Sequence, residues 1–232
     1  RAIETAVLQS RSDGAIIESF IDGKEYAAEG FTYKGKFYPL CLSEKRKVDS
    51  TNNTVANELF TPTIDKKISD EIWQVVQNAV LSLSDSDTSS HTEVLVDSLG
   101  KIWLVESAGR GGGFMVAEGL LPWAFGIDLA EISVKAACNI EMTIPEPNKT
   151  YATLRFYPSR KGILKSILGM DKCHGVRNLL VGALADIGTQ FSEGQNDAAR
   201  LGYILARGNS QREALALADF AMESIEFNVE PE

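Results

Sequence analysis

Residues 91–113 read HTEVLVDSLGKIWLVESAGRGGG. Two runs of alternating apolar and polar residues flank a turn that contains Gly100, which is the pattern of a β-hairpin. Each run nevertheless carries a carboxylate where a strand would normally place an apolar residue, Glu93 in the first and Glu106 in the second. Counting outward from the turn predicts that Glu93 lies opposite Leu104 or Val105, within about two positions of Glu106.

These two glutamates need an explanation, because like charges on neighbouring strands destabilise a sheet. A partly buried carboxylate without a partner also costs on the order of several kcal/mol. A divalent cation would compensate both, since Mg²⁺ favours one or two carboxylates and completes its shell with water and phosphate oxygens. Alternatively, one glutamate points to solvent or pairs with Lys101 or Arg110. For the pair together we favour the metal site.

The glycine-rich segment GRGGG, residues 109–113, follows the second glutamate directly. Glycines let a backbone approach an anion closely. The segment is neither a P-loop nor a G-x-G-x-x-G motif, and a tight turn is its usual explanation. Arg110 adds chemical content, because a guanidinium binds carboxylate or phosphate through two hydrogen bonds. Metal ligands, an arginine and a flexible backbone together indicate a site for phosphoryl oxygens.

The composition is that of an ordinary globular protein, with 44% hydrophobic and 24% charged residues among 232. A net charge of -9 argues against a general binder of nucleic acid or of anionic membranes. Three cysteines, far apart and in no C-x-x-C pair, favour a reduced, cytoplasmic protein without disulfides or zinc. No apolar run approaches the about 20 residues of a membrane helix, and the charged start does not resemble a signal peptide.

Hydrophobic periodicity and turn residues predict an α+β fold with antiparallel strands and packed helices. A smaller C-terminal α+β lobe, residues 150–232, is expected to follow a larger unit, residues 1–143, after the proline-containing stretch 144–149. We predict helices at 1–11, 65–83, 126–139 and from the capping box Ser210–Glu213 onward. We predict strands at 15–21, 24–34, 36–46, both arms of the hairpin, 151–157, 162–168, 176–184 and 200–206. Asp22-Gly23 and Lys34-Gly35 are the expected turns, and 48–63 is an expected loop.

The hairpin resembles the metal-binding hairpin of the ATP-grasp superfamily, in which H-T-E is followed by G-K and then E-x-N-x-R-x-G-G. Residues 16–31, IIESFIDGKEYAAEGF, resemble the hinge strand of the same family. The likeness covers about residues 1–140, and residues 201–218, LGYILARGNSQREALALA, are similar to the C-terminal lobe of some members. The resemblance implies an ATP-dependent carboxylate–amine ligase, which makes an acyl phosphate and then couples it to an amine.

The resemblance also implies roles for individual residues. Glu93 and Glu106 would bind Mg²⁺ or Mn²⁺, and Arg110 would steady the transferring phosphoryl oxygens. His91 would line the substrate side, although an ordinary hydrogen-bonded histidine is the alternative. Lys45 would contact phosphate, although a solvated charge cluster is the commoner explanation. The expected nucleotide-binding residues are Glu18, Ser19, Phe20 and Ile21 at the adenine, Glu25 at the ribose, Lys45 and Val105.

Two departures from the family pattern matter. Ala108 stands where the family often has asparagine, which would leave one metal less fully held. The chain starts without the two lysines and the substrate-side domain that precede the hinge in family members, so we expect it to be part of a longer enzyme and to bind MgATP weakly or not at all by itself.

The sequence is also compatible with three other functions. The first is a carboxylating or carbamoyl-forming ATP-grasp enzyme, which shares the nucleotide site. The second is a non-catalytic nucleotide-binding module, and the third is a plain structural α+β domain. The expected partners are a small-molecule carboxylate and an amine, with no nucleic acid and no membrane, and a homodimer is a further expectation.

Overall fold

The computed structural model describes residues 2–12, 14–47, 56–191 and 200–231. Its elements are α1 (Ala2–Gln9), β1 (Gly23–Tyr33), β2 (Lys36–Lys47), β3 (Ala56–Phe60), α2 (Lys66–Leu83), β4 (Thr88–Asp97), β5 (Ile102–Ala108), η1 (Val116–Phe125), α3 (Leu129–Ala137), β6 (Tyr151–Pro158), β7 (Gly162–Leu168), η2 (Met170–Cys173), β8 (Leu179–Ala183), β9 (Gln190–Phe191), β10 (Arg200–Gly208), α4 (Gln211–Ser224) and β11 (Glu226–Glu230).

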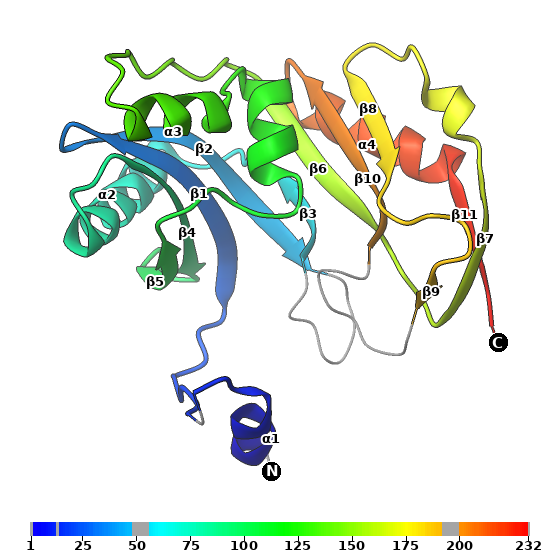
Figure 1. Ribbon diagram of the computed structural model, residues 1–232, viewed down its shortest axis with the longest axis horizontal. Helices are drawn as coiled ribbons and strands as arrows, with labels where there is room; N and C mark the ends of the chain where they lie inside the picture. Colours follow the sequence, from blue (N-terminus) through cyan, green and yellow to red (C-terminus); the bar gives the residue numbers. More distant parts are fainter. Residues whose placement is uncertain (1, 13, 48–55, 192–199, 232) are drawn as a thin grey trace.

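Antiparallel sheets organise the chain (Figure 1). The larger sheet has eight strands in the order β5-β4-β1-β2-β3-β6-β10-β8, and the smaller has three in the order β11-β7-β9. Helix α2 packs on one face of the β1, β2 and β4 region, while η1 and α3 cover the other. Helix α4 and the small sheet enclose a separate core beside β10. The predicted α+β class is confirmed.

The predicted boundary between two units stays a prediction. Residues 140–150 form no helix or strand, as their prolines suggest. Strand β3, however, pairs with β6 through Leu59 and Leu154, so strands from both predicted units belong to one continuous sheet. No helix in the described part of the chain has the length and apolar character that crossing a membrane requires.

Strand β1 corrects the predicted start of the sheet. Residues 15–21 do not form a strand, and Asp22-Gly23 is not a hairpin turn. The physical reason is that β1 is paired along both edges, with β2 on one side and β4 on the other, so no edge is left for the preceding segment. Ile16 and Phe20 of that segment are 86% and 91% exposed. The second predicted turn is confirmed, with positive φ at Lys34 (50°) and Gly35 (72°), the geometry of a type I′ hairpin.

Strand β3 corrects the predicted loop 48–63, of which residues 48–55 lie outside the described part of the chain. The sequence of this strand gives no strand pattern, because it places the charged Glu58 at a buried position. Glu58 is only 1% exposed, and partners from other strands neutralise its charge. The Glu58 carboxylate accepts hydrogen bonds from Arg155 Nε at 2.7 Å and from Thr153 Oγ1 at 3.1 Å, and forms an ion pair with Arg46. A strand of this kind has no alternating apolar pattern to detect.

The predicted helices are confirmed with small shifts at their ends. Helix α2 begins after Asp65, whose side chain accepts a hydrogen bond from the Lys67 N–H at 2.8 Å. Helix α4 begins after Ser210, whose hydroxyl accepts from the Glu213 N–H at 3.2 Å. The sequence did not predict η1, a buried π-helix in which Pro122 interrupts the usual helical signal. The short strands β9 and β11 were not predicted either.

Candidate nucleotide and metal site

The two glutamates of the hairpin face each other directly. Strand β4 pairs with β5 so that Glu93 and Glu106 are Cα partners. The prediction that Glu93 lies opposite Leu104 or Val105 was therefore wrong by one or two residues. A β-bulge between Glu93 and Val94 shifts the register, because Val94 pairs with Leu104 and Val105 is the extra residue.

The environments of the two carboxylates differ. Glu93 is half-buried, and its Oε1 contacts Lys45 Nζ and lies 3.2 Å from His91 Nε2. Burial raises the pKa of Glu93, but the hydrogen bonds from His91 and Lys45 outweigh that effect and lower it to about 2. Glu106 is exposed and forms no ion pair with any described residue. The charge of Glu93 is thus compensated by Lys45 and His91, and not by Lys101 or Arg110, the partners that the sequence suggested.

His91 is buried between two carboxylates. Its Nδ1 contacts Glu29 Oε1, and its Nε2 faces Glu93. Burial lowers the pKa of His91, but the hydrogen bonds to Glu29 and Glu93 outweigh that effect and raise it to about 9. Glu29, 2% exposed, was not predicted as a site residue. The sequence pattern could have revealed it, since Glu29 lies on the same face of β1 as the core residues Ala27 and Phe31.

The raised pKa of His91 predicts a pH-dependent stability. Because the folded-state pKa of about 9 exceeds the unfolded value of 6.5, the contribution of His91 is complete below pH 6.5 and is lost as the pH rises through 9. We expect the free energy of unfolding, measured with urea, to fall by as much as about 3 kcal/mol over this interval.

His91→Gln should flatten that dependence, whereas His174→Gln, which changes the second histidine at an exposed position, should retain it. If the free energy of unfolding of His91→Gln still fell between pH 6.5 and 9 as in the wild type, His91 would not be the cause of the pH dependence.

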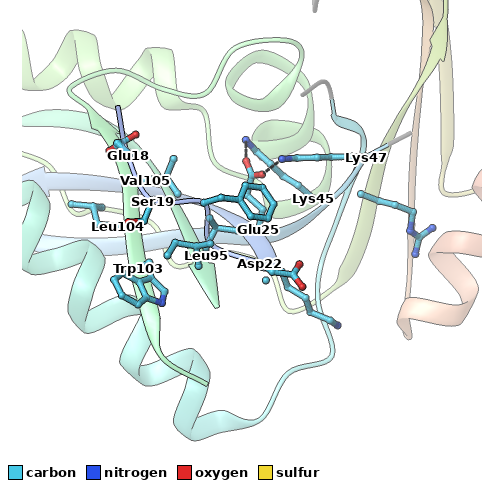
Figure 2. A pocket seen from close by; sticks show the side chains of 15 residues that line it. Glu18, Ser19, Asp22, Glu25, Lys45, Lys47, Leu95, Trp103, Leu104 and Val105 are labelled. Carbon is cyan, nitrogen blue, oxygen red and sulfur yellow. Dashed lines mark hydrogen bonds and ion pairs between the residues drawn. The ribbon is translucent and has the colours of Figure 1, made fainter. Parts of the chain in front are cut away.

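A cavity of about 730 Å³ lies beside the hairpin (Figure 2). Its wall includes the segment Glu18–Glu25, Lys45–Lys47, and Leu95, Trp103, Leu104 and Val105. The cavity therefore brings together all the residues predicted to bind the nucleotide. Glu25 points toward two ammonium groups, with Lys45 Nζ at 2.8 Å and Lys47 Nζ at 2.6 Å.

A second cavity, of about 500 Å³, holds the predicted metal ligands and catalytic groups. It is lined by Lys45, Ala56, Leu59, His91, Glu93, Glu106, Arg110, Gly111, Gly113, Phe114, Val116 and Arg200. Lys45 lines both cavities, so the two spaces adjoin at one ammonium group. Arg200, from β10, was not predicted; it stacks on Phe156 at 3.7 Å from the ring centroid, and only the tertiary fold brings it here.

The residues present fit a divalent cation. Ligand atoms of His91, Glu93 and Glu106 all lie within 4.8 Å of one another, but both ring nitrogens of His91 are engaged by Glu29 and Glu93, which leaves the two carboxylates as the ligands. Two opposed carboxylates, one of them exposed, supply the hard oxygen ligands that Mg²⁺ and Mn²⁺ prefer. Ala108 is the Cα partner of His91, so the imidazole stands across the strand pair from the position where the family pattern has asparagine.

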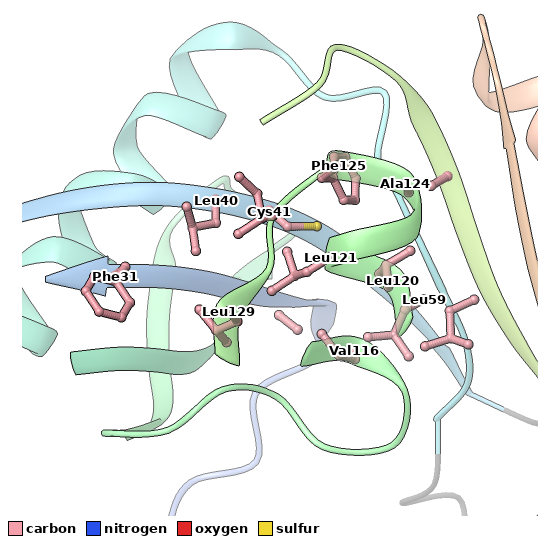
Figure 3. Packing of buried hydrophobic residues seen from close by; sticks show 14 of the residues in the cluster. Phe31, Leu40, Cys41, Leu59, Val116, Leu120, Leu121, Ala124, Phe125 and Leu129 are labelled. Carbon is pink, nitrogen blue, oxygen red and sulfur yellow. The ribbon is translucent and has the colours of Figure 1, made fainter. Parts of the chain in front are cut away.

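The glycine-rich segment packs against Leu129 and Val116 of the apolar core that Figure 3 shows. A Cβ atom at Gly111 would lie 2.5 Å from Leu129 Cδ2, and one at Gly112 would lie 2.5 Å from Glu29 Oε1. Both glycines are therefore needed for close packing. The Arg110 guanidinium is exposed, donates to the Gly111 carbonyl at 3.0 Å, and makes no ion pair within the described residues.

Two parts of the chain match known family profiles. Residues 2–118 match the sequence profile of the ATP-grasp domain, and residues 155–230 match that of L-amino acid ligase C-terminal domain 2. A search of curated protein sequences gives no match.

Solved structures share the fold. The crystal structure of L-amino acid ligase from Bacillus licheniformis superposes with a TM-score of 0.78 at 20% identity, over 91% of this chain and 53% of that chain. Phosphoribosylglycinamide synthetase from Anaerococcus prevotii gives 0.73 at 17%, over 98% and 58%. The biotin carboxylase domain of the Hydrogenobacter thermophilus 2-oxoglutarate carboxylase gives 0.77 at 12%, over 98% and 51%. The chain thus spans little more than half the length of these proteins. Its ATP-grasp profile match, over residues 2–118 of 232, extends across half of the sequence, and the chain belongs to the ATP-grasp family.

Proposed function

We propose that the protein acts as an ATP-dependent ligase, or as part of one, that activates a carboxylate as an acyl phosphate and couples it to an amine. The observation that carries the proposal is the pairing of Glu93 with Glu106 at a cavity that shares Lys45 with a larger one. A cation site beside a nucleotide-sized cavity is the arrangement that phosphoryl transfer requires.

In this proposal the larger cavity holds the nucleotide. The segment 18–21 and Val105 would contact the adenine, and Glu25 would accept hydrogen bonds from the ribose hydroxyls. Lys45 would reach the phosphates from its place between the cavities. Glu93 and Glu106 would hold Mg²⁺ or Mn²⁺, which when bound would neutralise charge on the phosphoryl oxygens.

The chemistry then follows from charge. A substrate carboxylate oxygen attacks the γ-phosphorus, the bond to the β-γ bridging oxygen breaks, and ADP leaves. Arg110 donates hydrogen bonds to the oxygens on which charge accumulates. The amine next attacks the acyl carbon and releases phosphate, and the amine nitrogen loses a proton. His91 lines this cavity, so it would contact the substrate side.

The C-terminal part of the chain supports an amine acceptor. Its match to an L-amino acid ligase domain over residues 155–230 favours carboxylate–amine coupling. A carboxylating or carbamoyl-forming enzyme is the second candidate, because the fold is equally similar to a biotin carboxylase domain. A non-catalytic nucleotide-binding module is the third, supported by Ala108 and by the ion pair that already occupies Glu93.

Hydroxylamine trapping separates these candidates. The full-length protein, given MgATP, a mixture of amino acids and hydroxylamine, should form ADP and a hydroxamate, which reports an acyl phosphate. ADP formation that depends on bicarbonate and yields no hydroxamate would favour the second candidate. ATP binding without any ADP formation would favour the third.

We also propose a cytoplasmic location, small-molecule carboxylate and amine substrates, and a homodimer. Sedimentation of the purified full-length protein at several concentrations tests the last of these. A single species of monomer mass at all concentrations would contradict the dimer.

Glu25→Ala in the full-length protein should mainly raise the KM for ATP. Loss of a carboxylate that accepts hydrogen bonds from the ribose is expected to raise the KM about tenfold. The value of kcat should change less, because Glu25 does not line the cavity of the proposed cation site. Steady-state kinetics with varied ATP measures both. Asp70→Ala, which removes an exposed ion pair with Lys66 on α2, serves as a control outside the cavity wall. An unchanged KM would contradict the ribose assignment.

A further inference from the structure

Glu29 is a buried carboxylate beside the candidate site, with 2% of its surface exposed. It lies in the middle of β1, where a register shift in the pairing with β2 falls between Glu29 and Gly30. Its Cα partner on the other side is His91 of β4. The neighbours on its face of the strand, Ala27 and Phe31, belong to the apolar core.

Both oxygens of this carboxylate are bound by the chain. Oε1 contacts His91 Nδ1, and Oε2 accepts a hydrogen bond from the Gly112 N–H at 2.9 Å. The approach of Gly112 depends on its missing side chain, since a Cβ there would lie 2.5 Å from Oε1 and 3.0 Å from His91 Nδ1. One carboxylate thus connects two strands and a loop: β1 itself, β4 through His91, and the segment that follows β5.

Contacts on two sides hold the segment 109–113 in place. Glu29 binds the N–H of Gly112, and Leu129 of α3 fills the space beside Gly111. Arg110 directly precedes these two glycines. Because its exposed guanidinium forms no ion pair in the described part of the chain, the position of Arg110 depends on the backbone of this clamped segment.

The fold alone gives no reason for a carboxylate here. Burying one is expensive, and a buried charged network is often replaced by apolar residues without loss of stability. The chain of contacts runs from Gly112 through Glu29 and His91 to Glu93, so it joins the arginine-bearing segment to a proposed cation ligand.

We propose that Glu29 is a positioning residue: it holds the glycine segment 109–113, and with it Arg110, in register with His91 and Glu93. Its effect on turnover rests on the proposed function; its effect on the segment does not. Orientation of this kind is what a hydrogen-bonded second layer supplies to a reacting site.

The test uses Glu29→Gln in the full-length protein. The amide keeps the size of the side chain but has one oxygen for two donors. That oxygen stays with His91, whose N–H is the stronger donor, so the NH₂ group faces the Gly112 N–H and this contact is lost. We expect exchange of the Gly112 amide hydrogen, followed by NMR, to accelerate about tenfold or more. We expect kcat for ADP formation to fall about tenfold, with the KM for ATP nearly unchanged, because Glu29 does not line the nucleotide cavity.

Gly112→Ala tests the same contact from the other side and retains Glu29. It should reproduce the loss of kcat, and the double variant should be no worse than either single variant, because all three break one contact. Tyr157→Phe is the matched control. It removes a buried hydrogen bond of 2.7 Å to the Ala221 carbonyl, in a core that lines neither cavity. It should lower the melting temperature and leave exchange at Gly112 and kcat unchanged.

Wild-type exchange at Gly112 in Glu29→Gln would overturn the inference. So would a lower melting temperature with unchanged kcat, since Glu29 would then be merely structural. If the wild-type protein hydrolyses no ATP under any condition, the proposed function fails, and the exchange measurements alone decide whether Glu29 holds the segment.

Discussion

Glu93→Gln and Glu106→Gln should each lower the single-turnover rate of ATP cleavage by about 10²-fold or more, and they should differ in their effect on stability. Both remove a proposed ligand of the cation, which explains the common loss of rate. Glu106 is exposed and has no ion-pair partner among the described residues, so its replacement relieves repulsion with Glu93. We expect the metal-free Glu106→Gln protein to be unchanged or more stable by up to about 1 kcal/mol.

Glu93→Gln should instead lower the free energy of unfolding by about 1–3 kcal/mol, because Lys45 and His91 lose a charged partner. Rapid-quench kinetics with Mg²⁺ and urea unfolding without metal measure the two effects. Glu71→Gln removes one negative charge from α2, outside both cavity walls, and should change neither quantity. Wild-type turnover in both site variants would remove the main support for the ligase proposal.

Lys45→Met should weaken ATP binding by about 10- to 10²-fold and also destabilise the metal-free protein. The substitution keeps an apolar stem but removes the ammonium group that Glu25 and Glu93 share. Burial lowers the pKa of Lys45, but the hydrogen bonds to Glu25 and Glu93 outweigh that effect and raise it, so the group is charged at neutral pH. We expect a loss of about 1–3 kcal/mol in the free energy of unfolding.

Calorimetric titration with MgATP and urea unfolding measure these effects. Adding Glu93→Gln to Lys45→Met should restore part of the lost stability, because it removes a carboxylate that has lost a partner. Lys47→Met is the matched control. Its side chain is more exposed than that of Lys45, at 40% against 13%, and among the described residues it pairs with Glu25 alone, so the loss of stability should be smaller. Equal losses in the two variants would contradict a special role for Lys45.

Local patterns were sufficient where an element carries its own signal. The turn at Lys34-Gly35, the helix from Asp65 onward and the helix start at Ser210 each depend on residues within a few positions, and each is present as predicted. Predictions from local patterns were wrong where contacts between residues far apart in the sequence decide the structure. Residues 15–21 have a strand-like composition, yet both edges of β1 are occupied by other strands.

The same distinction between local patterns and distant contacts applies to the candidate site. The sequence by itself determined the hairpin, the presence of Glu93, Glu106 and Arg110 on it, and the likeness to the ATP-grasp family, because these are properties of short contiguous motifs. The compensation of Glu93 by Lys45, 48 residues away, could not be inferred from spacing.

Only the tertiary structure decided the direct opposition of Glu93 and Glu106, since it depends on a bulge that leaves no mark in the alternation of residues. The same holds for Glu29, which is 83 residues from Gly112 in sequence yet bonded to it. The physical reason is that a buried charge is tolerated only where partners satisfy it, and those partners come from whichever strands the completed sheet places side by side.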